Sequence, residues 1–263
     1  MSATIFRYCF LGLVGIFLAT PLLIVAGVSF NHNTLMIFPP QQAGFIWYRT
    51  FFSDPDWIAA LDRSLGIGIS AALLAVSIAT PICYVMWRFN IKVAKILYSL
   101  GLASFLLPPI VLAIAFLVFW SWTGYGGQIG DVIISHAIVF VALPLITITL
   151  GFRSVDAALV EAGRMMGARE SDVIRTIVFP IIAPYMVSGL IFVFVLSLNE
   201  YIIAYMVAGF TTETLPIKVF NSLRMGFQPT MCVGAVLFML IGVAGFTAIA
   251  IIADLPKLLG ADR

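Results

Sequence analysis

One acidic side chain, Glu200, lies inside a long apolar run and is the first candidate for chemistry in this chain. If the run spans a membrane, an ionised carboxylate there costs about 2.5–3.5 kcal/mol even on lenient insertion scales, so it should face a cavity or a partner chain. Three roles stay open: contact with a cationic substrate, a bond inside the protein or to a partner, or a protonated carboxyl. Asn199, Tyr201 and Tyr205 lie close by in sequence, and aromatic faces attract ammonium groups. These four residues form the candidate substrate pathway, although packing alone also explains each tyrosine.

Two adjacent prolines, Pro108 and Pro109, interrupt another apolar run and join the candidate pathway. Each removes a backbone hydrogen bond, and such breaks are tolerated in membranes only where protein or water meets them. A kink that shapes the pathway and a purely structural kink both fit this pattern. His136, near the predicted outer end of a span, should make an interfacial hydrogen bond rather than relay protons.

A polar loop, residues 154–183, is the second candidate site. Asp156 suits the N-cap of a first helix, and Gly167 suits the position just past its end, where a left-handed backbone costs glycine nothing. A second short helix over 173–178 is expected after a cap at Ser171 or Asp172. We expect Pro180 to end it, because proline removes a donor. Leu159, Met165 and Met166 are candidate apolar anchors for a partner, although a merely solvated loop is also consistent with the spacing.

These sites must be positioned by membrane helices, because the 263 residues are 62% hydrophobic and only 10% charged. A spanning helix needs about 20 mostly apolar residues. Six segments qualify, and the first is read as a retained anchor, since it is longer than a cleavable signal segment. The predicted spans are 10–30, 65–87, 94–120, 132–152, 185–209 and 231–253.

Basic residues predict the orientation of these spans. With both termini in the cytoplasm, only Arg49, Arg63, Lys218 and Arg224 of the 14 Lys and Arg residues fall outside. The polar loop is then cytoplasmic. The fold class is therefore an all-α, polytopic membrane protein with six transmembrane helices, N-in and C-in, forming a single domain over 1–263. The external segment 31–63 should pack at the interface, with docking of an external partner as the alternative.

The sequence lacks the residues that several classes of function require. No phosphate-binding Gly-x-x-x-x-Gly-Lys-Ser/Thr motif occurs, no Ser/His/Asp or Cys/His arrangement is evident, and the three cysteines lack metal spacing. Net charge is +2 without a basic cluster, which disfavours nucleic acid. We expect no enzyme activity, no metal and no cofactor in this chain.

The polar loop resembles the cytoplasmic EAA loop of binding-protein-dependent ABC importers. That pattern is Glu-Ala-Ala, three residues, Gly, nine residues, Ile, any residue, Leu-Pro. The spacing matches throughout, with Gly163 in place of the second alanine and Phe179 in place of leucine. The residues to which the resemblance assigns coupling to an ATPase are Ala158, Leu159, Glu161, Ala162, Gly163, Met166, Gly167, Ala168, Ile177 and Pro180.

The resemblance implies a type I importer permease of a bacterial inner membrane, with a shared core at about 60–255. It implies a second homologous permease, two ATP-binding subunits that hold ATP and Mg²⁺, and a periplasmic binding protein that delivers the solute. Transport would proceed by alternating access, with the loop acting as a coupling helix.

Within that superfamily the chain is similar to the spermidine/putrescine permease group, through 197–200, 214–220 and 224–226. The resemblance implies polyamine transport. An importer of 4-aminobutyrate, of an aminophosphonate or of ferric iron is the alternative. An ATPase-independent channel or carrier and a membrane scaffold are the alternatives from other classes.

Overall fold

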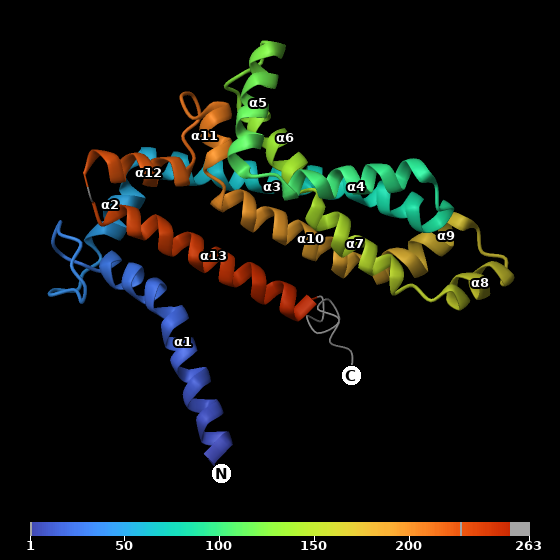
Figure 1. The fold of residues 1–263 in the computed structure, drawn as a ribbon, viewed down its shortest axis with the longest axis horizontal. Helices are drawn as coiled ribbons and strands as arrows, with labels where there is room; N and C mark the ends of the chain where they lie inside the picture. Colours follow the sequence, from blue (N-terminus) through green and yellow to red (C-terminus); the bar gives the residue numbers. More distant parts are fainter. Residues whose placement is uncertain (1, 227, 253–263) are drawn as a thin grey trace. The chain divides into compact units, whose positions relative to one another are not determined.

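The computed structural model describes residues 2–226 and 228–252, and these ranges are helical apart from connecting loops and one isolated bridge, between Asn31 and Ala43 (Figure 1). The predicted all-α class is confirmed. The elements are α1 Ser2–Ser29, α2 Ile46–Ser53, α3 Pro55–Phe89, α4 Lys92–Leu106, α5 Pro109–Thr123, α6 Ile129–Phe140, α7 Ala142–Arg153, α8 Ala157–Met165, α9 Glu170–Val173, a π-helical turn Ile174–Val178, α10 Phe179–Asn199, α11 Ile202–Ala208, α12 Leu215–Met225 and α13 Thr230–Ile252.

Four helical runs in the described ranges are long and apolar enough to cross a membrane: Ile5–Ser29, Pro55–Phe89, Glu170–Asn199 and Thr230–Ile251. Two bent pairs, α4 with α5 and α6 with α7, also qualify when each pair is taken as one span. That reading gives up to six spans, as predicted. Which side of the membrane the termini occupy stays a prediction, and the last residue predicted for the sixth span, Ala253, lies outside the described residues.

The predicted third span, 94–120, is not one straight helix. Its two halves meet at an angle of 111°, where α4 ends at Leu106 and α5 begins at Pro109. The bend follows from the two prolines. Pro109 occupies the first helical position, where its missing N–H costs nothing, while Leu107 and Pro108 take extended backbone angles.

The predicted fifth span, 185–209, has the wrong boundaries. The helix begins at Glu170 and ends at Asn199, and α11 follows as a separate short helix. Pro180 does not end the preceding helix either. A π turn comes just before it, in which the N–H of Phe179 donates to the Ile174 carbonyl, and Pro180 then sits in the first turn of α10, where proline is tolerated.

Contacts divide the chain into two compact units, Met1–Leu61 with Ile217–Leu240, and Asp62–Pro216 with Ile241–Arg263. The expectation of one domain stays a prediction. In the first unit Phe51 is fully buried against Trp57, and the Lys218 ammonium lies 5.4 Å from the Trp57 ring centre and 4.0 Å from Asp56. The external role predicted for 31–63 stays a prediction.

In the second unit α7 and α10 pack closely through glycines. A Cβ placed on Gly189 would lie 2.8 Å from the Cα of Pro144, and one on Gly151 would lie 2.9 Å from the Tyr185 ring. Small residues of this kind let membrane helices approach closely. This contact fixes the helix that joins the polar loop to Glu200.

Candidate functional site

The first half of the polar loop is the helix α8, and its start agrees with the prediction. The Asp156 side chain accepts a hydrogen bond from the N–H of Ala158 at 2.8 Å, which satisfies one of the free donors at the helix start. A short polar residue before an apolar run therefore defines this boundary locally.

The end of α8 is a Schellman turn at Gly167, also as predicted. Gly167 has φ +85°, its N–H donates to the Arg164 carbonyl at 2.9 Å, and the N–H of Ala168 donates to the Gly163 carbonyl at 3.2 Å. These two bonds satisfy carbonyls at the end of the helix. Gly167 is needed here because its backbone is left-handed.

The second half of the polar loop is not the separate short helix that was predicted. The Asp172 carboxylate accepts from the Arg169 N–H at 3.3 Å, and from Glu170 onward the helix runs without a stop through α9, the π turn and α10. The 30 residues of Glu170–Asn199 reach about 45 Å at 1.5 Å each. The polar loop is therefore connected rigidly to the residues around Glu200.

Two residues of the EAA-like pattern meet inside the polar loop. Gly163 is buried, and a Cβ placed there would lie 3.1 Å from Cδ1 of Ile177 and 3.4 Å from a methyl group of Val173. The departure from alanine at position 163 thus coincides with close packing between the two halves of the loop.

A three-residue charge network holds the polar loop to the end of α3. Glu170 accepts from Arg88 Nε at 2.9 Å and from Arg164 Nε and a terminal Arg164 nitrogen at 3.1 and 3.0 Å. The side chains are about 34–43% exposed, so each single pair is weak, but the shared carboxylate makes it a network. Sequence reasoning missed Arg88 because it lies 82 positions from its partner.

The remaining predicted coupling residues lie on the surface of the loop. Ala158, Leu159, Glu161, Ala162 and Met166 are exposed, together with Gly167 and Pro180, whereas Ala168 and Ile177 are half-buried. Leu159 is 52% exposed, and Met165 and Met166 are more than 80% exposed. Large apolar side chains outside a predicted span, with no covering element in the described residues, form a surface suited to a partner protein.

Glu200 lies at a helix break rather than within a span. It follows the last residue of α10 with an extended backbone, and its carboxylate accepts from the N–H of Ile203 at 2.9 Å and from the N–H of Ala204 at 3.0 Å. Its side chain is about 10% exposed. The carboxylate satisfies backbone donors at the start of α11, which would otherwise be left unpaired in a buried setting.

His136 is buried beside this carboxylate, so the prediction of an interfacial hydrogen bond is wrong. The ring is 1% exposed, its Nδ1 lies 2.7 Å from the Ser197 hydroxyl, and its Nε2 lies 3.2 Å from a Glu200 carboxylate oxygen. Position near the end of an apolar run suggested exposure. Only the packing of α6 against α10 and α11 brings the ring to Glu200.

The other predicted pathway residues do not form one cavity with Glu200 in the part of the chain that the structure describes. Asn199 is exposed and donates to the Val195 carbonyl, whereas Tyr201 and Tyr205 are half-buried and stack with ring centres 5.3 Å apart. Pro108 and Pro109 are exposed at the bend between α4 and α5.

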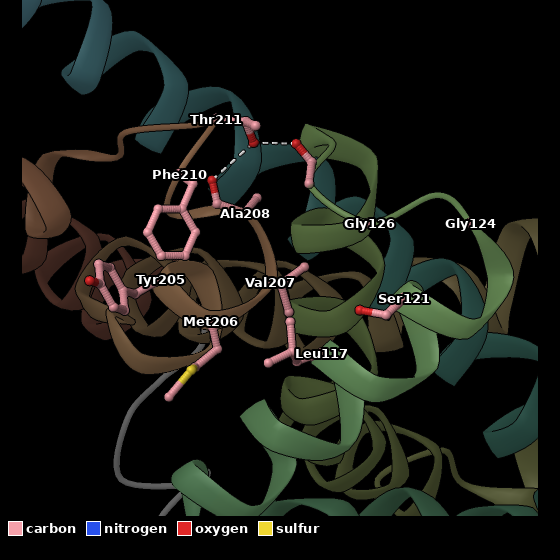
Figure 2. A pocket seen from close by; sticks show the side chains of 11 residues that line it. Leu117, Ser121, Gly124, Gly126, Tyr205, Met206, Val207, Ala208, Phe210 and Thr211 are labelled. Carbon is pink, nitrogen blue, oxygen red and sulfur yellow. Dashed lines mark hydrogen bonds between the residues drawn. The ribbon is translucent and has the colours of Figure 1, made fainter.

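A hollow of about 480 Å³ lies between α5, the loop that follows it and α11, and Figure 2 shows the side chains that line it. Tyr205 stands at its edge, with the ring of Phe210 6.1 Å away, and Phe210 is 94% exposed. Thr211 donates to the carbonyls of Gly127 and Ala208, which ties together the loops at the rim. The lining is mostly apolar, and its volume is typical of a small-molecule site. Of the predicted pathway residues, only Tyr205 lines this hollow.

Comparison with known proteins defines the class. The model of the binding-protein-dependent transport system inner membrane component matches residues 79–255, two thirds of the chain. The chain therefore belongs to this family. It is a non-catalytic, multi-pass permease component of the inner membrane, and it works with ATPase subunits and a binding protein in an ABC importer.

Particular relatives match over nearly the whole chain. The spermidine/putrescine transport system permease protein PotC of Haemophilus influenzae is 26% identical over 93% of this chain and 95% of its own. The putrescine transport system permease protein PotI of Escherichia coli is 28% identical over 92% of this chain and 88% of its own. A crystal structure of a bacterial ABC transporter involved in import of the polysaccharide alginate matches with TM-score 0.64, 16% identity and 90% coverage of both chains, which supports the fold alone.

Proposed function

We propose that this permease imports a polyamine, putrescine or spermidine, delivered by a periplasmic binding protein. The observation that carries the proposal is the near full-length similarity to PotC and PotI, which their names describe as permeases for these cargoes. The stacked rings of Tyr201 and Tyr205 beside Glu200 also suit an alkylammonium chain, since aromatic faces attract cations.

The proposed pathway comprises Asn199, Glu200, Tyr201 and Tyr205, together with the bend at Pro108 and Pro109. In the complete importer a second, homologous permease chain would supply the other half. Two partner ATPases, which bind ATP and Mg²⁺, would drive alternating access. Their closure would move the paired polar loops, and the helix Glu170–Asn199 would transmit that motion toward the break at Glu200.

Uptake by whole cells tests the cargo. Deleting the gene for this chain should remove most accumulation of radiolabelled putrescine, and the wild-type gene should restore it. Competition with unlabelled spermidine, 4-aminobutyrate, an aminophosphonate or ferric iron then ranks the cargoes. Unchanged putrescine uptake in the deletion strain, together with loss of one competitor's uptake, would replace the polyamine by that competitor.

The substitution Glu161→Arg tests the proposed coupling by the polar loop. Glu161 is exposed on α8 beside Arg88 and Arg164, so the change reverses a charge on the proposed docking surface without disturbing a buried contact. We expect uptake to fall at least ~10-fold, equivalent to about 1.4 kcal/mol, with unchanged amounts of protein in the membrane. Retained uptake would show that Glu161 does not take part in coupling to the ATPase. Arg175→Glu, an exposed charge change elsewhere in the loop, is the matched control.

A further inference from the structure

The break between α10 and α11 is held by side chains rather than by a helix-breaking residue. Asn199, Glu200 and Tyr201 include no proline or glycine, so nothing in the local sequence forces the helix to stop. The backbone N–H groups of Ile203 and Ala204 instead find their acceptor in the Glu200 carboxylate, at 2.9 and 3.0 Å. Without that acceptor, the donors at the start of α11 would be unsatisfied in an apolar setting.

His136 joins this break to a different helix. Its Nδ1 lies 2.7 Å from the hydroxyl of Ser197, in the last turn of α10, and its Nε2 lies 3.2 Å from Glu200, just after that turn. Nε2 makes no well-directed hydrogen bond, so it contacts Glu200 by proximity alone. An ionised carboxylate only accepts, which favours the tautomer that has its hydrogen on Nε2 and accepts from Ser197 at Nδ1. The ring, 1% exposed, thus contacts both sides of the point where α10 ends.

The two ends of one helix therefore have distinct attachments. At Glu170 the helix Glu170–Asn199 belongs to the polar loop, and at Asn199 it meets the His136–Glu200 pair. Beyond the pair, α11 provides Tyr205, Met206, Val207 and Ala208 to the wall of the hollow in Figure 2. The angle at which α11 leaves α10 consequently decides the shape of that wall.

We propose that His136 and Glu200 act as a positioning pair, which fixes the outer end of the helix Glu170–Asn199 to α6 and holds α11 as the wall of the hollow. Only the expected effect on uptake rests on the proposed function, because the position of α11 does not depend on which cargo is transported. It replaces direct cargo contact by Glu200 with an indirect role: the carboxylate accepts from two backbone donors, lies beside an imidazole, and acts on the cargo through the placement of α11.

A double-mutant cycle separates positioning from direct cargo contact. The variants are Glu200→Gln, His136→Gln and the pair together, each measured for putrescine uptake and for the amount of protein in the membrane. For residues acting as one unit, both single variants should lower Vmax at least ~10-fold with KM within ~2-fold, and the double variant should be no worse than the poorer single variant. If Glu200 binds the cargo itself, Glu200→Gln raises KM at least ~10-fold while His136→Gln leaves it unchanged, which overturns the proposal.

A second readout needs no cargo and reports on α11 directly. Met206→Cys is introduced into a chain whose Cys9, Cys83 and Cys232 are replaced by alanine, and its rate of maleimide labelling is followed in membranes. Labelling should change several-fold, and by the same factor, in both single variants and in the double variant. Wild-type labelling rates in both single variants would reject the pair. Ser188→Ala, which removes a buried α10 hydroxyl bonded within its own helix, is the matched control and should label as wild type.

The two readouts keep the proposals distinct. If wild-type cells accumulate no putrescine, the polyamine proposal fails while the labelling arm still decides the positioning pair. A variant that does not accumulate in the membrane is replaced by Glu200→Asp or His136→Asn. Glu200→Asp withdraws the carboxylate from the ring and His136→Asn removes the ring, so both break the 3.2 Å contact and the same change in labelling is expected from either of them.

Discussion

Replacing Gly189 with leucine should prevent the protein from accumulating as a folded membrane protein. A Cβ at this position would lie 2.7 Å from the Thr147 hydroxyl and 2.8 Å from the backbone Cα of Pro144, closer than real contacts allow. Even Gly189→Ala forces α7 and α10 apart, at a cost of about 1–3 kcal/mol for overpacking. A larger side chain adds to that cost and separates helices that position both candidate sites.

Thermal unfolding of the purified chain in detergent measures this effect, with immunoblots of membranes for the leucine variant. The melting temperature of Gly189→Ala should fall by several degrees. Gly66→Ala is the matched control, since a Cβ there meets nothing within 4 Å. Alanine should leave that variant as stable as the wild type or stabilise it by up to ~1 kcal/mol. Equal melting temperatures for Gly189→Ala and Gly66→Ala would show that α7 and α10 are not in contact at Gly189.

Gly163→Leu should uncouple the polar loop from transport. The new side chain would meet Ile177 and Val173, which pack at 3.1 and 3.4 Å from the Cβ position, so α8 would move off the second half of the loop. Overpacking of about 1–3 kcal/mol there should shift the exposed surface of Leu159 and Met166. We expect at least a ~10-fold loss of uptake, equivalent to about 1.4 kcal/mol, in membranes with a normal amount of the protein.

The variant Gly163→Ala provides the control for this substitution. It restores the alanine of the EAA pattern and favours the helix by up to ~1 kcal/mol. The flexible end of Ile177 needs to yield by only a few tenths of an ångström, so uptake should stay near the wild-type level. If the leucine variant transports as well as the alanine variant, packing of the two halves of the loop is irrelevant to coupling.

In the polar loop, neighbouring residues in the sequence predict some features and not others. The cap at Asp156 and the turn at Gly167 were predictable because each depends on one side chain or one backbone angle. The end of the second helix was not. Proline breaks a helix when its missing N–H leaves a carbonyl unpaired and its ring clashes with the preceding turn. The π turn before α10 places Pro180 in the first turn of that helix, where proline is tolerated.

For the residues in and near the predicted spans, contacts between distant parts of the chain matter more than the local sequence. Hydropathy averaged over about 20 residues locates apolar runs, but it has no term for a break that proline or glycine does not mark. The end of α10 lies beside a contact between Glu200, just after that helix, and His136 on α6. The network of Arg88 with Glu170 was missed for the same reason.

By itself, the sequence determined that this protein is an all-helical membrane protein with a capped polar loop, and the resemblance of that loop to the EAA pattern indicated a permease. The helical class and the caps follow from composition and from bonds between near neighbours. Only the tertiary structure decided where α10 ends, what occupies the Glu200 carboxylate and which residues line the hollow beside α11. These features depend on contacts between residues far apart in the chain, and no periodicity or spacing in the sequence encodes such contacts.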